Sequence, residues 1–186
     1  MNSFTELRTA EIESILSKKG KLTREERIIL EIKNNPGIRF RELMKSMKVA
    51  NGVMSYYIQK LEKRGIIFTE RKSGVSRLFT DNIDTSDMSL IKFLRTATPK
   101  KIMLVLLKDD KLTFKQITEK IQMSPSTTSF YLKQLVSDNI IVTSRSDFKT
   151  VYSVSEKKRI ANLIEEYHPD IIEQASDNLS DIIESL

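Results

Sequence analysis

The sequence predicts a mainly α-helical protein with small β-hairpins, an α+β fold built from two tandem copies of one unit and flanked by terminal helices. Three observations predict it. The chain matches itself without a gap when shifted by 74 residues, so that Ile28 falls on Ile102 and Tyr57 on Tyr131. Each copy places apolar residues at helical spacings of three and four. Each copy then ends in two β-rich runs around a polar turn. A repeat of roughly 60 residues therefore indicates two similar domains.

Composition is that of an ordinary globular protein. Its 186 residues, 39% hydrophobic and 30% charged, are enough for two small domains. The absence of cysteine excludes disulfides and thiolate metal sites. We expect no membrane span, because no stretch approaches the roughly 18 apolar residues that one needs. The first residues lack the pattern of a signal peptide, so a soluble, cytoplasmic protein is expected.

In the first copy, the pattern predicts a helix over residues 24–34, ended by Asn35, Pro36 and Gly37. A short second helix and a third helix follow, and Gly65 suits the left-handed position after the third helix. The inward residues expected for these two helices are Phe40, Leu43, Met44, Met47, Met54, Ile58 and Leu61. The runs IIFTER and VSRLFT, joined by KSG, predict a hairpin.

In the second copy, Thr98 followed by Pro99 predicts a helix start, as does Ser124 followed by Pro125. Asn139 takes the place of Gly65. The runs IIVTSR and TVYSV, joined by SDFK, predict the second hairpin. The expected organisation is an N-terminal helix (1–22), a first domain (23–82), a linker helix (83–97), a second domain (98–155) and C-terminal helices (156–186).

The tail has the spacing of a short coiled coil. Its apolar residues recur at intervals of three and four, at Ile172, Ala175, Leu179, Ile182 and Leu186. Packing onto the helix's own domain is the simpler alternative, and two heptads are too few to hold a dimer alone. Together with the N-terminal helix, this segment nevertheless suggests a homodimer.

The stretches SYYIQKLEKRGII and SFYLKQLVSDNII, each preceded by FRELMKSMKV or FKQITEKIQM and followed by a polar-tipped hairpin, resemble winged helix-turn-helix domains. They are similar to ArsR/MarR-like regulators. The tandem arrangement, with a tail containing EEYHPDIIEQ, looks most like archaeal two-winged-helix transcriptional regulators. The resemblance covers residues 24–155. It implies binding to double-stranded DNA, with 51–64 and 125–138 as the recognition helices.

Residues on the outer side of these two helices are the candidates for contacts with bases. Asparagine and glutamine amides pair with adenine, and hydroxyls serve several bases. The candidates are Asn51, Ser55, Tyr56, Gln59, Ser126, Thr127, Ser129 and Lys133. For Tyr56, packing in the core is an equally weighted alternative.

Charge differs strongly between the copies. Residues 39–77 hold ten cations and three acids, a net +7, whereas residues 113–151 hold five and three, a net +2. Residues 156–186 hold three cations and eight acids, a net −5. A solvated face is the usual meaning of a charge run, but here both helix and hairpin supply cations. The wings are expected on the DNA backbone or in the minor groove. The expected backbone and wing contacts are Arg39, Arg41, Lys45, Lys60, Lys63, Arg71, Lys72, Arg77, Lys115, Arg145 and Lys149.

The sequence gives little support to an enzyme. His168 is the only histidine, and no phosphate-binding loop or metal motif is present. We therefore expect no catalytic residues, metal or cofactor. The leading hypothesis is a sequence-specific transcriptional regulator associated with the nucleoid. A non-specific architectural DNA-binding protein and a protein-docking module of the transcription machinery are the alternatives. The sequence indicates neither an effector nor its absence.

Overall fold

The computed structural model describes residues 14, 15, 17, 21–72, 74–81 and 83–167. It divides into two compact units, Met1–Met88 and Ser89–Leu186. The division falls inside the predicted linker helix. Most of the predicted N-terminal helix and all of the apolar seam after residue 167, with His168, lie outside the described residues.

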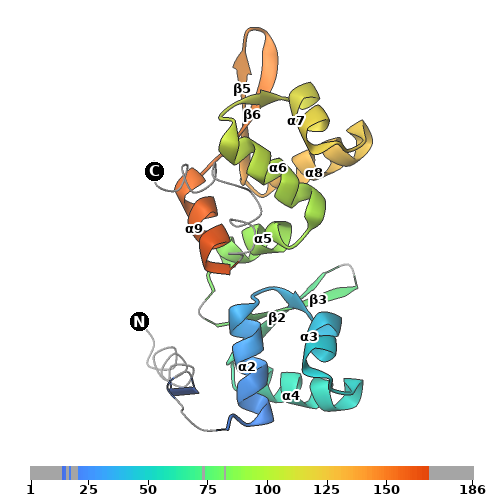
Figure 1. Cartoon of the computed structure of the whole chain (residues 1–186), viewed down its shortest axis with the longest axis vertical. Helices are drawn as coiled ribbons and strands as arrows, with labels where there is room; N and C mark the ends of the chain where they lie inside the picture. The colour runs from blue at the N-terminus through green and yellow to red at the C-terminus, as the bar shows by residue number, and fades with distance from the viewer. Residues whose placement is uncertain (1–13, 16, 18–20, 73, 82, 168–186) are drawn as a thin grey trace. The chain divides into compact units, whose positions relative to one another are not determined.

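From residue 24 to residue 80, the described part of the first unit forms three helices and a three-stranded sheet (Figure 1). The helices are α2 (Arg24–Asn34), α3 (Phe40–Met47) and α4 (Asn51–Lys63). The strands are β1 (Ile38–Arg39), β2 (Ile67–Lys72) and β3 (Val75–Thr80), in the order β1-β3-β2. All pairs are antiparallel, and β2 and β3 form the predicted hairpin, here called the first wing.

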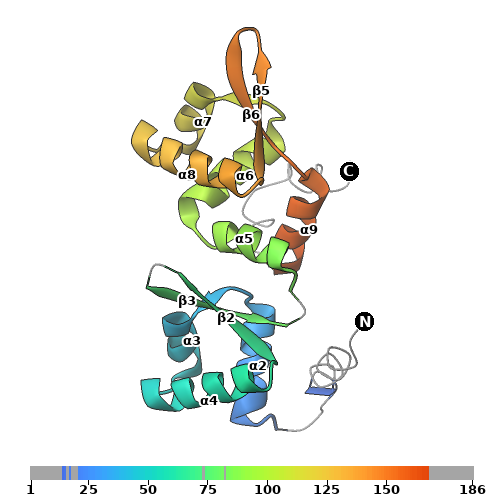
Figure 2. The same ribbon diagram turned by 180° about the vertical axis from the view of Figure 1, so that it is seen from behind.

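The second unit repeats this arrangement (Figure 2). Its helices are α6 (Ala97–Lys108), α7 (Phe114–Ile121) and α8 (Pro125–Ser137). Its strands are β4 (Leu112–Thr113), β5 (Ile141–Ser146) and β6 (Lys149–Val154), in the order β4-β6-β5, and β5 with β6 forms the second wing. The helices α5 (Thr85–Leu94) and α9 (Lys157–Tyr167) add Leu90, Phe93, Leu94, Ile160 and Ile164 to the core of this unit.

The structure confirms the predicted fold class of tandem α+β units, and it adds one short strand to each. Two residues before the second helix pair with the wing, as in Ile38 with Leu78 and Leu112 with Tyr152. A run of two residues is too short for an alternating pattern to reveal. This third strand anchors the start of α3 and α7 to the wing.

Helix boundaries follow the sequence closely, with one difference. Ser124 caps α8 by accepting a hydrogen bond from the Thr127 amide at 3.3 Å, as predicted. The start of α6 differs, because Thr96 rather than Thr98 is its N-cap residue and Pro99 lies in the first turn. Proline is tolerated there because first-turn amides have no partner within the helix. After α4 and α8, Gly65 and Asn139 have positive φ angles of 68° and 56°, as predicted.

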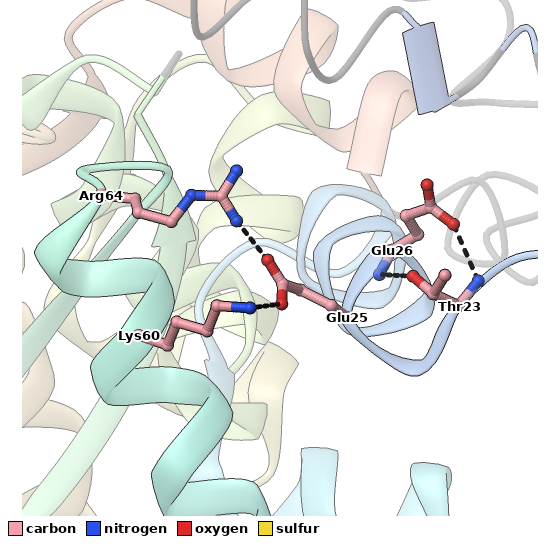
Figure 3. A network of polar contacts seen from close by, with 5 residues as sticks. All are labelled: Thr23, Glu25, Glu26, Lys60 and Arg64. Atoms are coloured by element: carbon pink, nitrogen blue, oxygen red, sulfur yellow. Dashed lines mark hydrogen bonds and ion pairs between the residues drawn. The ribbon is translucent and has the colours of Figure 1, made fainter.

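A capping box fixes the start of α2 and gives a stability prediction. The Thr23 amide donates to Glu26 Oε2 at 2.7 Å, and the Glu26 amide donates to Thr23 Oγ1 at 3.2 Å (Figure 3). Replacing Thr23 with alanine should lower the free energy of unfolding by about 1 kcal/mol. Denaturant titration measures this loss. The same midpoint for variant and wild type would show that the cap does not stabilise α2.

Candidate nucleic-acid interface

The core fixes which side of α4 faces outward. Met54, Ile58 and Leu61 are buried in the first unit, each at most 4% exposed. Asn51, in the first turn, and Gln59 are exposed to solvent. Two of the other predicted base contacts lie on this helix as well: Ser55 is half-buried and donates to Asn51 Oδ1 at 3.4 Å, and Tyr56 is 62% exposed. The four residues thus lie together along one helix.

The paired aromatics divide between solvent and core in both units. Tyr56 and Phe130 are exposed, at 62% and 55%, whereas Tyr57 and Tyr131 pack partly against their cores. Each pair stacks edge to face, with ring centroids 5.4 and 5.1 Å apart. The core-packing alternative for Tyr56 is therefore wrong, since its neighbour occupies that place.

Several predicted backbone contacts are exposed cations around α3 and the first wing. They are Arg39, Arg41, Lys45, Lys63 and Lys72. Two of the predicted contacts, Arg71 and Arg39, are paired with carboxylates. Arg71 Nη2 donates to both oxygens of Glu62, at 2.9 and 3.1 Å, and so joins the first wing to α4. Arg39 lies 3.9 Å from Glu42 in a looser pair.

The carboxylate of Glu25 holds one cation of α4 and the arginine that caps the end of this helix (Figure 3). Glu25 of α2 accepts from Lys60 Nζ at 2.5 Å through one oxygen and from Arg64 Nη1 through the other. The hydrogen bond to Glu25 raises the pKa of Lys60 above its ordinary value of 10.5. Because Glu25 is only 17% exposed while both cations are more exposed, it is the fixed centre of this group.

The prediction for Arg77 is wrong. Its residue is only 6% exposed, and its Nη1 donates to the Gly37 carbonyl oxygen at 3.0 Å. Arg77 lies opposite Arg39 in the sheet, and the side chain holds the turn between α2 and β1. A guanidinium placed inside the fold cannot lie against a phosphate, so Arg77 supports the wing from within.

In the second unit, the predicted DNA contacts differ in how exposed they are and in what they bind within the fold. Ser126 and Thr127 are engaged with the cap, their hydroxyls lying 3.0 and 2.8 Å from Ser124 Oγ. Lys133 is exposed and, with half-buried Ser129, lines a cavity of about 360 Å³. The remaining walls are mostly apolar and include Phe114, Leu132, Val136 and Tyr152. Lys115 lies 3.9 Å from Glu119, and Arg145 and Lys149 are exposed on the second wing.

Sequence reasoning missed Glu25, Glu62 and Phe148. The repeat offered a signal for each, because a 74-residue shift places Pro99, Val136 and Gly74 at the matching positions. Departures between otherwise similar copies mark where their chemistry differs. Neither a candidate metal cluster nor a helix long and apolar enough to cross a membrane occurs in the described part of the chain.

Comparison with known proteins agrees with this geometry. A profile described as winged helix-turn-helix DNA-binding matches residues 15–67 and 95–142, more than half of the chain. An uncharacterized HTH-type transcriptional regulator of Methanocaldococcus jannaschii is 25% identical over 125 residues, which are 67% of this chain and 32% of the relative. The match thus spans about a third of that relative's length. The two profile matches fall on the two repeated units, and the chain therefore belongs to the winged helix-turn-helix DNA-binding family, with two copies of its domain.

Proposed function

We propose that this protein is a sequence-specific regulator of transcription that binds double-stranded DNA chiefly through its first unit. The main support is the exposed side of α4, where Asn51, Ser55, Tyr56 and Gln59 lie along one helix. A helix of this kind fits the major groove, and amide side chains there distinguish adenine from the other bases. The name of the archaeal relative, an HTH-type transcriptional regulator, also supports a regulatory role.

The cations around this helix would contact phosphates. Arg39, Arg41 and Lys45 surround the start of α3, while Lys63, Arg71 and Lys72 lie on α4 and the first wing. Such contacts position a protein on DNA without selecting a sequence. A polar helix bordered by cations therefore supports both base recognition by the helix and phosphate binding by the cations. Lys60 belongs to this set once it leaves Glu25. Arg77 does not belong to it, because its side chain is buried.

The second unit would bind more weakly. Its face offers α8, with Ser126, Thr127, Ser129 and Lys133, and the cations Lys115, Arg145 and Lys149. The two DNA-binding domains would extend over residues 23–82 and 98–155. Pairing of two copies through the terminal segments would place two first units on two half-sites, as most helix-turn-helix regulators do. The protein would then act in the cytoplasm, bound to the nucleoid.

The decisive experiment measures binding of the full chain to random duplex DNA over a salt series, followed by selection of sites from a random pool. A steep salt dependence with a recovered motif supports the proposal, and a two-part motif supports the dimer. A steep dependence without a motif would indicate an architectural protein. No binding at low salt would contradict DNA binding and leave a protein-docking role.

Gln59 tests sequence recognition directly. Replacing it with alanine should cost about 1–3 kcal/mol of discrimination at one base pair of the selected site, because a bidentate amide contact is lost. Competition between the selected site and single-base variants measures this. Lys72→Ala is the matched control, which should weaken all sites alike and reduce the salt slope by about 1. Unchanged discrimination by the Gln59 variant would place this residue outside the groove.

A further inference from the structure

The tip of the second wing is built around an exposed aromatic. Asp147 and Phe148 join β5 to β6, and Ser146 pairs with Lys149 across the turn. Both turn residues have positive φ angles, 48° and 61°, as a type I′ turn requires. The Phe148 side chain is fully exposed, with a relative exposure of 108%. Its ring therefore gains nothing from packing within the fold.

The first wing has a different residue at the matching position of its turn. Shifted by 74 residues, Phe148 falls on Gly74, whose φ angle is 74°. Glycine adopts this conformation without steric cost, whereas a bulky side chain does so rarely and at a cost in stability. The second wing thus keeps a large apolar residue where the backbone favours glycine. Strain of this kind, with no gain in packing, points to a role outside the fold.

The surroundings of Phe148 indicate the partner. Arg145 and Lys149 flank it on the two strands, both are exposed, and neither forms an ion pair with another residue that the structure describes. Residues 142–150 are all exposed, and the hairpin projects past α7 and α8 of its own unit (Figures 1 and 2). An aromatic between cations at the end of a narrow hairpin matches a phosphate-lined groove better than an apolar protein surface.

We propose that Phe148 is a wedge that enters the minor groove of duplex DNA and partly unstacks one base step, while Arg145 and Lys149 contact the flanking phosphates. The proposal rests on the proposed function, because it assumes a bound duplex. Apolar side chains that insert in this way kink DNA, and pyrimidine–purine steps yield most easily. The first unit would then recognise bases through α4, and the second would recognise how easily its DNA deforms.

The test uses the full chain and duplexes that carry 2-aminopurine at TA steps within the selected site. Binding of the wild type should raise the fluorescence, because the base loses its stacking. Phe148→Asn removes the ring but keeps a residue that tolerates positive φ, so it should lose this signal and bind about tenfold more weakly. Relief of the strain should leave its melting temperature unchanged or raise it by about 2–4 °C. Phe148→Leu should keep much of the signal.

Val75→Asn is the matched control, since Val75 is an exposed apolar residue of the first wing and should leave the fluorescence unchanged. Tight binding by the wild type without a fluorescence change would overturn the wedge and leave the proposed function standing. The same holds if Phe148→Asn equals the wild type in affinity and signal, or if it changes only self-association in sedimentation. No binding of any duplex would overturn both proposals.

Discussion

Replacing Arg77 with alanine is expected to destabilise the first unit by about 2–3 kcal/mol. The change removes a buried, charged donor and leaves the Gly37 carbonyl oxygen without the hydrogen bond it accepts at 3.0 Å. Gly37 itself donates to the Leu78 carbonyl oxygen at 2.8 Å, so the loss acts on the junction between α2 and the sheet. For a unit of this size, the loss should lower its unfolding temperature by roughly 10–20 °C. Calorimetry measures it as a shift of one transition.

Arg71 is the matched control for Arg77. It lies on the neighbouring strand and is 62% exposed, and its contacts with Glu62 are those of a surface pair. Arg71→Ala should therefore change stability by about 1 kcal/mol or less but weaken DNA binding and lower its salt slope by about 1. If Arg77→Ala instead melts at the same temperature as the wild type but binds DNA more weakly, Arg77 contacts the DNA and does not act as a buried support of the wing.

The two arginines also show how far a sequence predicts this structure. The repeat and its apolar periodicity were enough for the tandem fold, for α2 at Arg24–Asn34 and for the caps at Ser124, Gly65 and Asn139. These features depend on neighbours within a few residues, and local patterns record them. The burial of Arg77 could also have been predicted from the sequence. Strand alternation places Arg77 on the same face as buried Phe79, and the 74-residue shift aligns it with the apolar residue Val151. Its positive charge alone led to the prediction of a phosphate contact.

Contacts between distant residues were beyond the sequence. Glu25 meets Lys60 and Arg64 across 35 and 39 positions, and no periodicity links an acid on one helix to two cations on another. The net charge of +7 for residues 39–77 therefore overstates the charge available to DNA, since Glu25 lies outside that range. The role proposed for Phe148 was likewise beyond the sequence, because it depends on a positive φ angle that only the structure shows. Candidate residues follow from sequence, but their availability depends on the fold.

Glu25→Gln is expected to strengthen DNA binding. In the proposed complex, Lys60 and Arg64 exchange a carboxylate for phosphates, and a neutral glutamine amide holds both cations more weakly and removes a negative charge beside the helix. We expect affinity to rise about tenfold at 0.1 M salt, with a salt slope steeper by about 0.9 for each new phosphate contact. Fluorescence anisotropy over a salt series measures both. Glu31→Gln, which removes the same charge from the same helix, should have a much smaller effect.

The stability of this variant gives an independent check on the same contact. Since Glu25 raises the pKa of Lys60 in the folded protein, the pair stabilises the fold at pH values below 10.5. This stabilisation is lost as the pH rises through the folded pKa, because the ammonium then loses its proton. On the alkaline side, the stability difference between wild type and Glu25→Gln should thus shrink as the pH rises above 10.5. A variant that loses stability at neutral pH without gaining DNA affinity would make Glu25 a purely structural clamp and would place Lys60 and Arg64 away from the DNA.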